Sequence, residues 1–302
     1  MQAYTSLLRR VVSCFERPVW EIEPGEVDGM LGSLVAAGRA PGTRRQYLQM
    51  LRAFHAFLQH RYAAEIRVRF GVAVGDPLDA FNRLRHVQDE APARGLPPTA
   101  ERVAAFFTFT RARLATTGDY RAAARDYALL RTLYHSALRV SELVRLEQGD
   151  IHPLLGPSGK LHVRFGKAAK ASGPRPRWTP MLDGLDRILA WYQADVRPLY
   201  PSGAPLFCDA QGHALKPGAG RDRLARLLDT EGCSRPERFT PHALRRACAT
   251  HHYERGMDLL AVQQLLGHRH IASTMAYVRP SHTFIEDAWR RATAGALTAL
   301  AI

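Results

Sequence analysis

Between Gly71 and Pro98 the chain loses its apolar periodicity, and this interruption is the feature that most constrains its fold. The stretch includes the runs GDP and DEAPARGLPP. Proline, glycine and charged residues at this density favour turns and connections over packed helices. A chain of 302 residues is also longer than one hydrophobic core usually serves. We therefore expect two domains, residues 1–92 and residues 93–302.

Residues 41–62, PGTRRQYLQMLRAFHAFLQHRY, give the clearest helical pattern of the first domain. The apolar face consists of four residues at helical spacing: Tyr47, Leu51, Phe54 and Leu58. Four polar residues flank that face: Arg44, Arg45, Arg52 and His55. Thr43 is placed to cap the helix. The pattern indicates an amphipathic bundle helix whose arginines either face solvent or contact phosphate.

The second domain begins with a helical pattern over residues 99–146, broken by TTGD at 116–119. Residues 159–181, GKLHVRFGKAAKASGPRPRWTPM, then alternate apolar and polar side chains around a centre rich in glycine, lysine and proline. This alternation predicts a short hairpin or small sheet with a basic loop. The remainder is mainly helical, so the expected fold class is mainly α with a small β-sheet in the second domain.

Charge indicates the kind of partner. The chain has 42 Lys and Arg against 28 Asp and Glu, a formal charge of +14. Such a surplus concentrates polyanions at the surface, so nucleic acid is the leading partner, with a membrane surface or a merely charged coat as alternatives. The four cysteines form no CxxC pair, which indicates neither a zinc ribbon nor a disulfide framework.

The chain shows no pattern of a targeting or membrane segment. Its first residues carry charges throughout and do not resemble a signal peptide. No window approaches the roughly 20 apolar residues that cross a bilayer. We expect a soluble intracellular protein.

Arg139 lies in an apolar helical context, LLRTLYHSALRVSELVRL. Burying a guanidinium is costly unless an anion accompanies it. Glu142, three residues on, supplies one candidate. Arg139 is therefore either half of an internal salt bridge or a functional arginine that a carboxylate orients.

A second group of polar residues follows a predicted helix start. Thr240 and Pro241 have the marks of a cap and first position, and His242 and Arg245 then share one face of the first turn. The amino terminus of a helix is a favourable place for a phosphate, although an isolated His and Arg would more often be surface residues.

The next predicted helix, residues 258–266, ends at Gly267 and delivers His268 just beyond it. Tyr277 follows nine residues later in the run ASTMAYVR. Alone, this tyrosine would indicate a core or interface position.

Together these residues resemble the tyrosine recombinases, or phage integrases. Four segments carry the resemblance, in order: ALRVSEL, FGKAAK, PHALRR and LLGHRHIASTMAYV. The separations from His242 to Arg245, Arg245 to His268 and His268 to Tyr277 are 3, 23 and 9 residues and are similar to those of the family. Thr43 and Tyr47 resemble a Thr-x-x-x-Tyr segment of its core-binding domain. The resemblance implies a helical core-binding domain followed by a mixed α/β catalytic domain.

The resemblance also implies a mechanism without metal, ATP or any other cofactor. Tyr277 would attack the scissile phosphorus and form a 3′-phosphotyrosyl intermediate with a free 5′-hydroxyl. Arg139 and Arg245 would stabilise the non-bridging oxygens, and Glu142 would orient the site. His242 and His268 would bind the phosphate or help to remove the tyrosine proton.

The resemblance assigns the general acid to Lys167, which follows Gly166 directly. The family usually has a glycine after this lysine, whereas here Ala168 follows, so Lys170 is an alternative. The candidate DNA-binding residues are Thr43, Arg44, Arg45 and Lys170.

Three other functions fit parts of the pattern. A catalytically inactive DNA-binding regulator would share the fold, and a type IB topoisomerase would share the tyrosine chemistry. A metal-dependent hydrolase would use four histidines that lack HExxH-like spacing: His251, His252, His268 and His270.

The expected partners follow from strand exchange. They are double-stranded DNA recombination sites, a homo-tetramer on two duplexes, and accessory DNA-bending or partner recombinase proteins. The helical tail SHTFIEDAWRRATAGALTALAI would pack on its own domain or on a neighbouring protomer. No membrane is involved, and the expected location is the cytoplasm, with the nucleoid.

Overall fold

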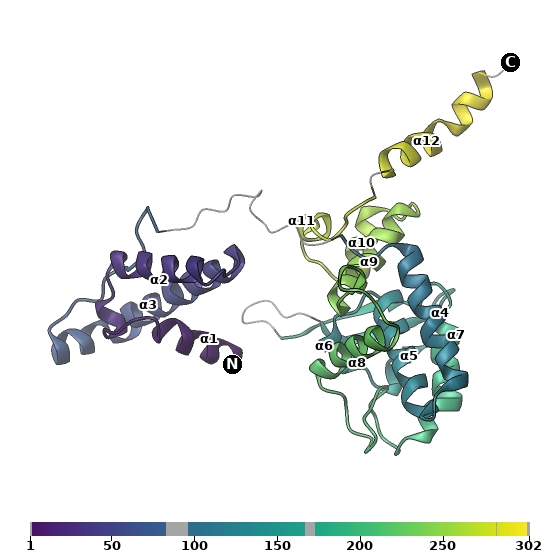
Figure 1. Cartoon of the computed structure of the whole chain (residues 1–302), viewed down its shortest axis with the longest axis horizontal. Helices are drawn as coiled ribbons and strands as arrows, with labels where there is room; N and C mark the ends of the chain where they lie inside the picture. The colour runs from purple at the N-terminus through teal and green to yellow at the C-terminus, as the bar shows by residue number, and fades with distance from the viewer. Residues whose placement is uncertain (1, 83–95, 167–172, 282, 301–302) are drawn as a thin grey trace. The chain divides into compact units, whose positions relative to one another are not determined.

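The computed structural model describes residues 2–82, 96–166, 173–281 and 283–300. The chain divides into two compact units, Met1–Gly95 and Leu96–Ile302 (Figure 1). Each unit has its own hydrophobic core. The boundary expected after residue 92 falls in a segment outside the described residues.

The smaller unit is helical. Its elements are α1 (Gln2–Val12), the short 3-10 turn Val19–Glu21, α2 (Pro24–Ala36) and α3 (Pro41–Phe70). Its core contains Val11 from α1, Val27 and Met30 from α2, and Leu48 and Leu51 from α3. Three amphipathic helices thus bury one shared face.

The predicted helix at residue 41 is present, but its boundaries differ from the expectation. The cap position is Ala40, which makes no side-chain cap, so the prediction of Thr43 as cap is wrong. Pro41 fits the first position because its fixed φ suits a helix and its missing N–H leaves nothing unpaired there. The helix continues to Phe70 and stops at Gly71, whose φ of 73° is left-handed.

His55 was expected beside the apolar face and is instead buried, with 2% exposure. The chain after α3 folds back along the helix, and this return covers the ring. The His55 Nδ1 atom lies 3.4 Å from the Gly75 carbonyl, and Gln59 donates to the Val74 carbonyl at 3.2 Å. The spacing of apolar residues along one helix cannot predict contacts with a segment that lies 15 to 20 residues away.

The larger unit contains the sheet and most helices. Its elements are α4 (Ala100–Thr116), α5 (Tyr120–His135), α6 (Val140–Leu143), β1 (Ile151–His152), β2 (Lys160–Gly166), β3 (Arg175–Pro180), α7 (Leu185–Trp191), α8 (Pro217–Thr230), α9 (Pro241–Glu254), α10 (Leu259–Leu266), α11 (Ile271–Met275) and α12 (Phe284–Leu300). The expected fold class, mainly α with a small sheet, is confirmed.

The break predicted at TTGD separates α4 from α5. Asp119 caps α5 by accepting a hydrogen bond from the Ala122 N–H at 3.0 Å. A second break was not predicted: α5 stops at His135, and Ala137 has a left-handed φ of 50°. The prediction of a continuous helix through residue 146 is therefore wrong. Residues 136–139 form a connection that leads into α6.

The predicted hairpin is confirmed. The three strands are antiparallel in the order β1-β2-β3, and Leu161 pairs with Thr179. Leu161 and Val163 point into the core. On the opposite face His162 stacks on Trp178 with ring centroids 4.4 Å apart.

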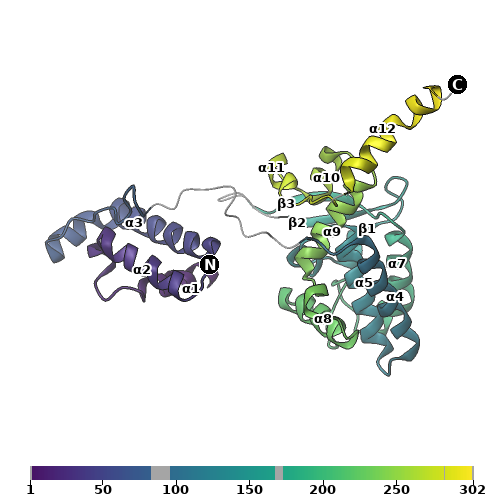
Figure 2. The same ribbon diagram turned by 45° about the horizontal axis from the view of Figure 1, so that its top comes forward.

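Helix α5 is the centre of the larger unit. It packs against α4, α7 and α9 (Figure 2). Leu129, Leu130 and Leu133 on α5 are at most 1% exposed. The chain that follows α5, which contains Ala137 and Arg139, therefore lies beside α9. None of the described helices has the length and apolar character needed to cross a bilayer.

Leu129→Ala should destabilise the larger unit by about 2–5 kcal/mol, because a fully buried leucine leaves a cavity when truncated. The control is Leu154→Ala, whose side chain is 96% exposed and should cost less than about 0.5 kcal/mol. Urea unfolding of the full chain measures both. Equal midpoints for the two variants would contradict the central role of α5.

Candidate active site

Arg139 begins the site from the connection after α5. The sequence predicted that Arg139 lies inside a helix. In the structure it instead occupies the extended cap position of α6, with φ −75° and ψ 148°. Its side chain is 24% exposed, so the residue is partly accessible. Its Nη1 atom donates to Glu142 Oε1 at 2.7 Å.

Glu142 is the acidic centre of the site. Its side chain is 1% exposed, and it also accepts a hydrogen bond from the Arg139 backbone N–H at 3.0 Å. Arg177 on β3 donates to both carboxylate oxygens, and Arg245 Nη1 lies 3.9 Å from Oε2. Burial raises the pKa of Glu142, but the hydrogen bonds and charges of Arg177 and Arg139 outweigh it and lower the pKa to about 2. Glu142 is therefore ionised at neutral pH.

Arg245 is the most deeply buried cation of the site, with 1% of its side chain exposed. Its guanidinium donates to the main-chain carbonyls of Ala137 and Leu266. Burial, followed by the charge of Arg139, lowers the pKa of Arg245 to about 10. The guanidinium thus keeps its proton at neutral pH, and carbonyl oxygens hold it without cancelling its charge.

Helix α9 places His242 and Arg245 on one face, as predicted. Thr240 caps the helix by accepting from the Ala243 N–H at 3.2 Å, and Pro241 is the first residue. His242 is exposed at the mouth of the site. The start of α9 therefore presents one exposed imidazole and one buried guanidinium.

Helix α10 ends where the sequence predicted. Gly267 has a left-handed φ of 62°, and His268 follows. His268 Nε2 lies 3.4 Å from Arg245 Nη2, and its Nδ1 lies 3.1 Å from Thr274 Oγ1. Because arginine can only donate, Nε2 must accept, which leaves the proton on Nδ1, facing Thr274. The contacts therefore select one neutral tautomer of His268.

Tyr277 lies in the turn after α11, where its backbone N–H donates to the Thr274 carbonyl at 2.8 Å. Its ring is half-buried among three predicted site residues. The ring centroids of His242 and His268 lie 5.1 and 4.7 Å away, and Arg245 Cζ lies 5.8 Å from the Tyr277 centroid. Residues far apart in sequence therefore meet around one tyrosine.

Some predicted residues are not in this group. Lys167 and Lys170 lie in the segment 167–172, outside the described residues. Thr43, Arg44 and Arg45 belong to the first turn of α3 in the smaller unit, and each is half-buried.

Arg177 is the site residue that sequence reasoning missed. The strand prediction placed it in the hairpin, but its pairing with Glu142 joins residues 35 positions apart. Strand alternation gives only a weak signal, since Arg175 shares the same side. The ion pair depends on how the sheet packs against α6.

Two of the proposed metal ligands have structural partners instead. The ring of His251 contacts Tyr134 Oη at 2.7 Å and the Pro98 carbonyl at 3.1 Å. Arg255 Nη2 donates to His252 Nδ1 at 3.0 Å, and burial lowers the pKa of His252 to about 4. No cluster of three potential metal ligands occurs among the described residues.

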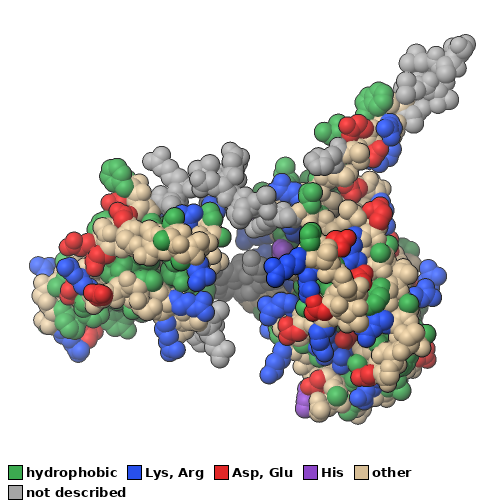
Figure 3. All heavy atoms as spheres, viewed as in Figure 1, with side chains coloured by type: hydrophobic (Ala, Val, Ile, Leu, Met, Phe, Trp, Pro, Cys, Tyr) green, Lys and Arg blue, Asp and Glu red, His purple; other side chains and the backbone are tan. Residues whose placement is uncertain are grey.

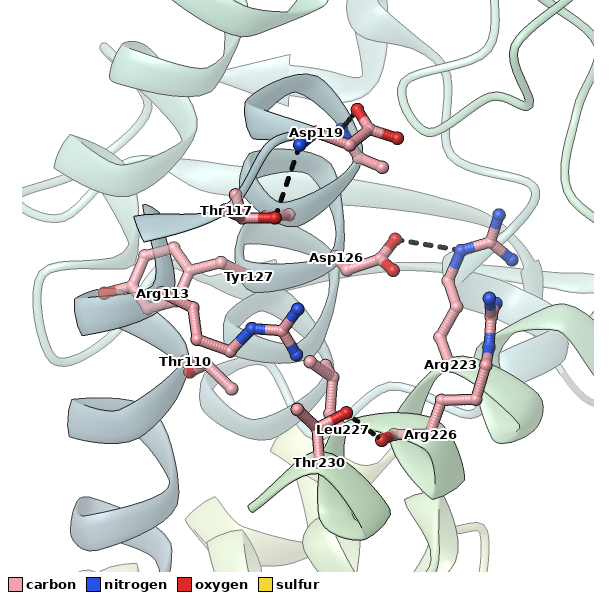
Figure 4. A pocket seen from close by; sticks show the side chains of 12 residues that line it. Thr110, Arg113, Thr117, Asp119, Asp126, Tyr127, Arg223, Arg226, Leu227 and Thr230 are labelled. Carbon is pink, nitrogen blue, oxygen red and sulfur yellow. Dashed lines mark hydrogen bonds and ion pairs between the residues drawn. The ribbon is translucent and has the colours of Figure 1, made fainter. Parts of the chain in front are cut away.

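A separate pocket of about 250 Å³ lies between α4, α5 and α8, and it contains none of the predicted site residues. Arg113 extends across it from α4, and Arg223 pairs with Asp126 at 2.9 Å (Figure 4). Asp126 also pairs with Arg125 at 2.8 Å, so this carboxylate is already held by two arginines.

Comparison with known proteins gives a family match. The model of the phage integrase family matches residues 112–283. Tyrosine recombinase XerC of Nitrobacter winogradskyi is 34% identical over 169 residues, 56% of this chain, and the chain spans only half of that relative's length. Tyrosine recombinase XerD of Listeria innocua is 26% identical over 275 residues, covering 89% of this chain and 82% of the relative.

Two solved structures have a similar fold. XerH site-specific recombinase, bound to a palindromic difH substrate after cleavage, has a TM-score of 0.69 at 20% identity, covering 94% of this chain and 75% of its own. The Tn1549 transposon integrase, in complex with transposon right end DNA, has a TM-score of 0.70 at 17% identity, covering 97% and 93%. Both similarities concern the two-domain architecture.

Glu142→Gln should lose stability in a pH-dependent way. Because the pKa of Glu142 is lower in the folded protein than its ordinary value of 4.5, the ionised carboxylate stabilises the fold at pH values above 4.5. This contribution is lost as the pH falls from 4.5 toward 2. The difference in unfolding free energy should be about 3 kcal/mol at pH 7 and should shrink below about pH 4. Thermal unfolding of both proteins between pH 7 and pH 3 measures it. A difference that does not change with pH would contradict the ionised, paired state.

Proposed function

This chain belongs to the phage integrase family, and from that membership we propose that it is a site-specific recombinase that cuts and rejoins DNA through a covalent bond to Tyr277. The observation that carries the proposal is the packing of the Tyr277 ring against His242, His268 and Arg245. A tyrosine beside a buried, partly unneutralised cation is suited to attack on a phosphodiester.

Charge supports a phosphodiester as the substrate. The guanidiniums of Arg139, Arg177 and Arg245 surround the one carboxylate of Glu142, which leaves a surplus of two positive charges among these four side chains. A phosphodiester approaching attack gains negative charge, and preorganised donors stabilise it best where water is excluded. Lys and Arg side chains also gather along the left edge of the larger unit in Figure 3.

In the first step the Tyr277 hydroxyl oxygen bonds to the scissile phosphorus, and the bond to the 5′-oxygen breaks. Arg139 and Arg245 donate to the non-bridging oxygens. A tyrosine hydroxyl ordinarily ionises at about pH 10, so at neutral pH an adjacent histidine would have to help to remove the tyrosine proton. Lys167, with Lys170 as the alternative, protonates the departing 5′-oxygen.

In the second step a 5′-hydroxyl from another strand attacks the phosphotyrosine and releases Tyr277. One phosphoester bond forms as another breaks in each step, so no external energy source is required. Two duplexes must be held together for exchange, and a homo-tetramer would supply the four active sites. Accessory DNA-bending or partner recombinase proteins, and a location with the nucleoid, belong to the same proposal.

The two units would share the work on the duplex. We propose that residues 1–92 form the core-binding domain, with Thr43, Arg44 and Arg45 at the start of α3 toward phosphate, and that residues 93–302 form the catalytic domain. XerH and the Tn1549 integrase are solved with DNA, which supports double-stranded DNA as the partner of this related fold.

Tyr277→Phe should abolish covalent attachment to DNA while leaving the fold intact. The substrate is a duplex that the protein itself selects from a random library, rebuilt with a nick so that the cleaved product cannot religate. The native protein should give an adduct on a denaturing gel with EDTA present. Specific binding without an adduct would favour the inactive regulator, and an EDTA-sensitive cut without an adduct would favour the hydrolase. Relaxation of supercoiled DNA with no strand exchange would favour the topoisomerase.

The double variant Arg44→Gln, Arg45→Gln should bind the selected duplex less tightly and with a weaker dependence on salt. Each lost phosphate contact should reduce the slope of log K against log salt by about 0.9. The double variant Arg61→Gln, Arg67→Gln, at exposed positions later on α3, is the control for the loss of two charges. Equal slopes for the double variant and the control would exclude a phosphate contact at the start of α3.

A further inference from the structure

Arg177 has no part in the mechanism above, although it is bound to the centre of the site. It lies on β3, and its side chain is 14% exposed. Its Nη1 atom donates to Glu142 Oε1 at 3.1 Å and its Nη2 atom to Oε2 at 2.8 Å. This two-point contact fixes the plane of the carboxylate as well as its position.

The same side chain supports the turn that leads to His268. A Cβ atom placed on Gly267 would come within 2.8 Å of both Cδ and Nε of Arg177. The stem of Arg177 therefore packs directly beneath the left-handed residue that ends α10. His268 is the next residue, so one side chain contacts the turn of His268 and the carboxylate that orients Arg139.

We propose that Arg177 is a positioning residue for strand cleavage: it holds Glu142 against Arg139 and supports the turn of His268 without itself binding the scissile phosphate. The inference rests on the proposed recombinase function. It also connects β3 to the site.

The geometry separates this role from direct catalysis. Both Nη groups of Arg177 are aimed at Glu142. Its Nε atom is buried without a hydrogen-bond partner among the described atoms. In contrast, Arg139 reaches Glu142 through Nη1 and keeps 24% of its side chain exposed. Arg139 is thus the arginine open to a ligand, and Arg177 is the one behind the carboxylate.

The test compares Arg177→Gln with Arg175→Gln, an exposed arginine two residues earlier on the same strand. The readouts are the rate of adduct formation on the selected nicked duplex at saturating protein, the affinity for that duplex, and the melting temperature. Arg177→Gln should slow cleavage by about 10–100-fold with affinity unchanged, because small misplacements of catalytic groups have effects of this size. Arg175→Gln should stay within about 2-fold.

The pH profile distinguishes positioning from general stability. Among the residues that the structure describes, the charged groups that pair with Glu142 are Arg139, Arg177 and Arg245. Without Arg177, Glu142 should take up a proton at a higher pH, so the deficit of Arg177→Gln should grow as pH falls from 7 to 5. If this variant does not fold, Arg177→Lys retains the charge but not the two-point contact, and its cleavage should also be slow. A Lys variant as fast as the native protein overturns the inference.

A double-mutant cycle with Glu142→Gln gives the decisive result. If Arg177 acts through Glu142, the double variant should cleave about as slowly as the slower single variant. Losses that multiply in full would mean that Arg177 acts independently of Glu142, which overturns the proposed hold on the carboxylate. Failure of the recombinase function has a different signature: the native protein forms no adduct at all. An adduct from both native protein and Arg177→Gln at equal rates rejects only the positioning role.

Discussion

The buried carboxylate of Glu142 is the interaction on which the site depends. Without it, the guanidiniums of Arg139, Arg177 and Arg245 would repel one another in a region that excludes water. With it, three arginines from three different segments of the larger unit converge at separations of 2.7–3.9 Å from one side chain. A buried ion group of this kind contributes little to net stability compared with an apolar core, but it determines which segments must meet.

The backbone supplies what the ion group cannot. Helix α5 is buried against α4, α7 and α9, so its carboxyl end is fixed by packing. The chain then turns through Ala137, whose left-handed φ costs about 1–2 kcal/mol for a residue with a Cβ atom. The carbonyl of this buried residue accepts a hydrogen bond from Arg245. Local strain is thus offset by apolar burial elsewhere in the unit.

Local patterns predicted the parts of the site that depend on local rules. Thr240 and Pro241 fixed the start of α9, and Gly267 fixed the end of α10, because caps and left-handed positions have specific residue preferences. Family resemblance then supplied the chemistry of Tyr277. The sequence did not predict the break at Ala137 or the pairing of Arg177 with Glu142. Both depend on contacts between segments that periodicity does not describe.

The hydrogen bonds of Arg245 affect its orientation and its charge in different ways. Its Nη1 and Nη2 atoms each donate to a main-chain oxygen, of Ala137 and Leu266, and these oxygens carry no net charge. The side chain is therefore fixed in position, while its Nε keeps a donor without a hydrogen-bond partner among the described atoms. The two carbonyls fix its orientation, and the Glu142 carboxylate 3.9 Å away is shared with Arg139 and Arg177, so the charge of Arg245 is only partly neutralised. An arginine fixed by carboxylates loses much of its attraction for an anion. Arg245 is fixed mainly by uncharged carbonyl oxygens, so its rigid orientation does not remove its attraction for an anion.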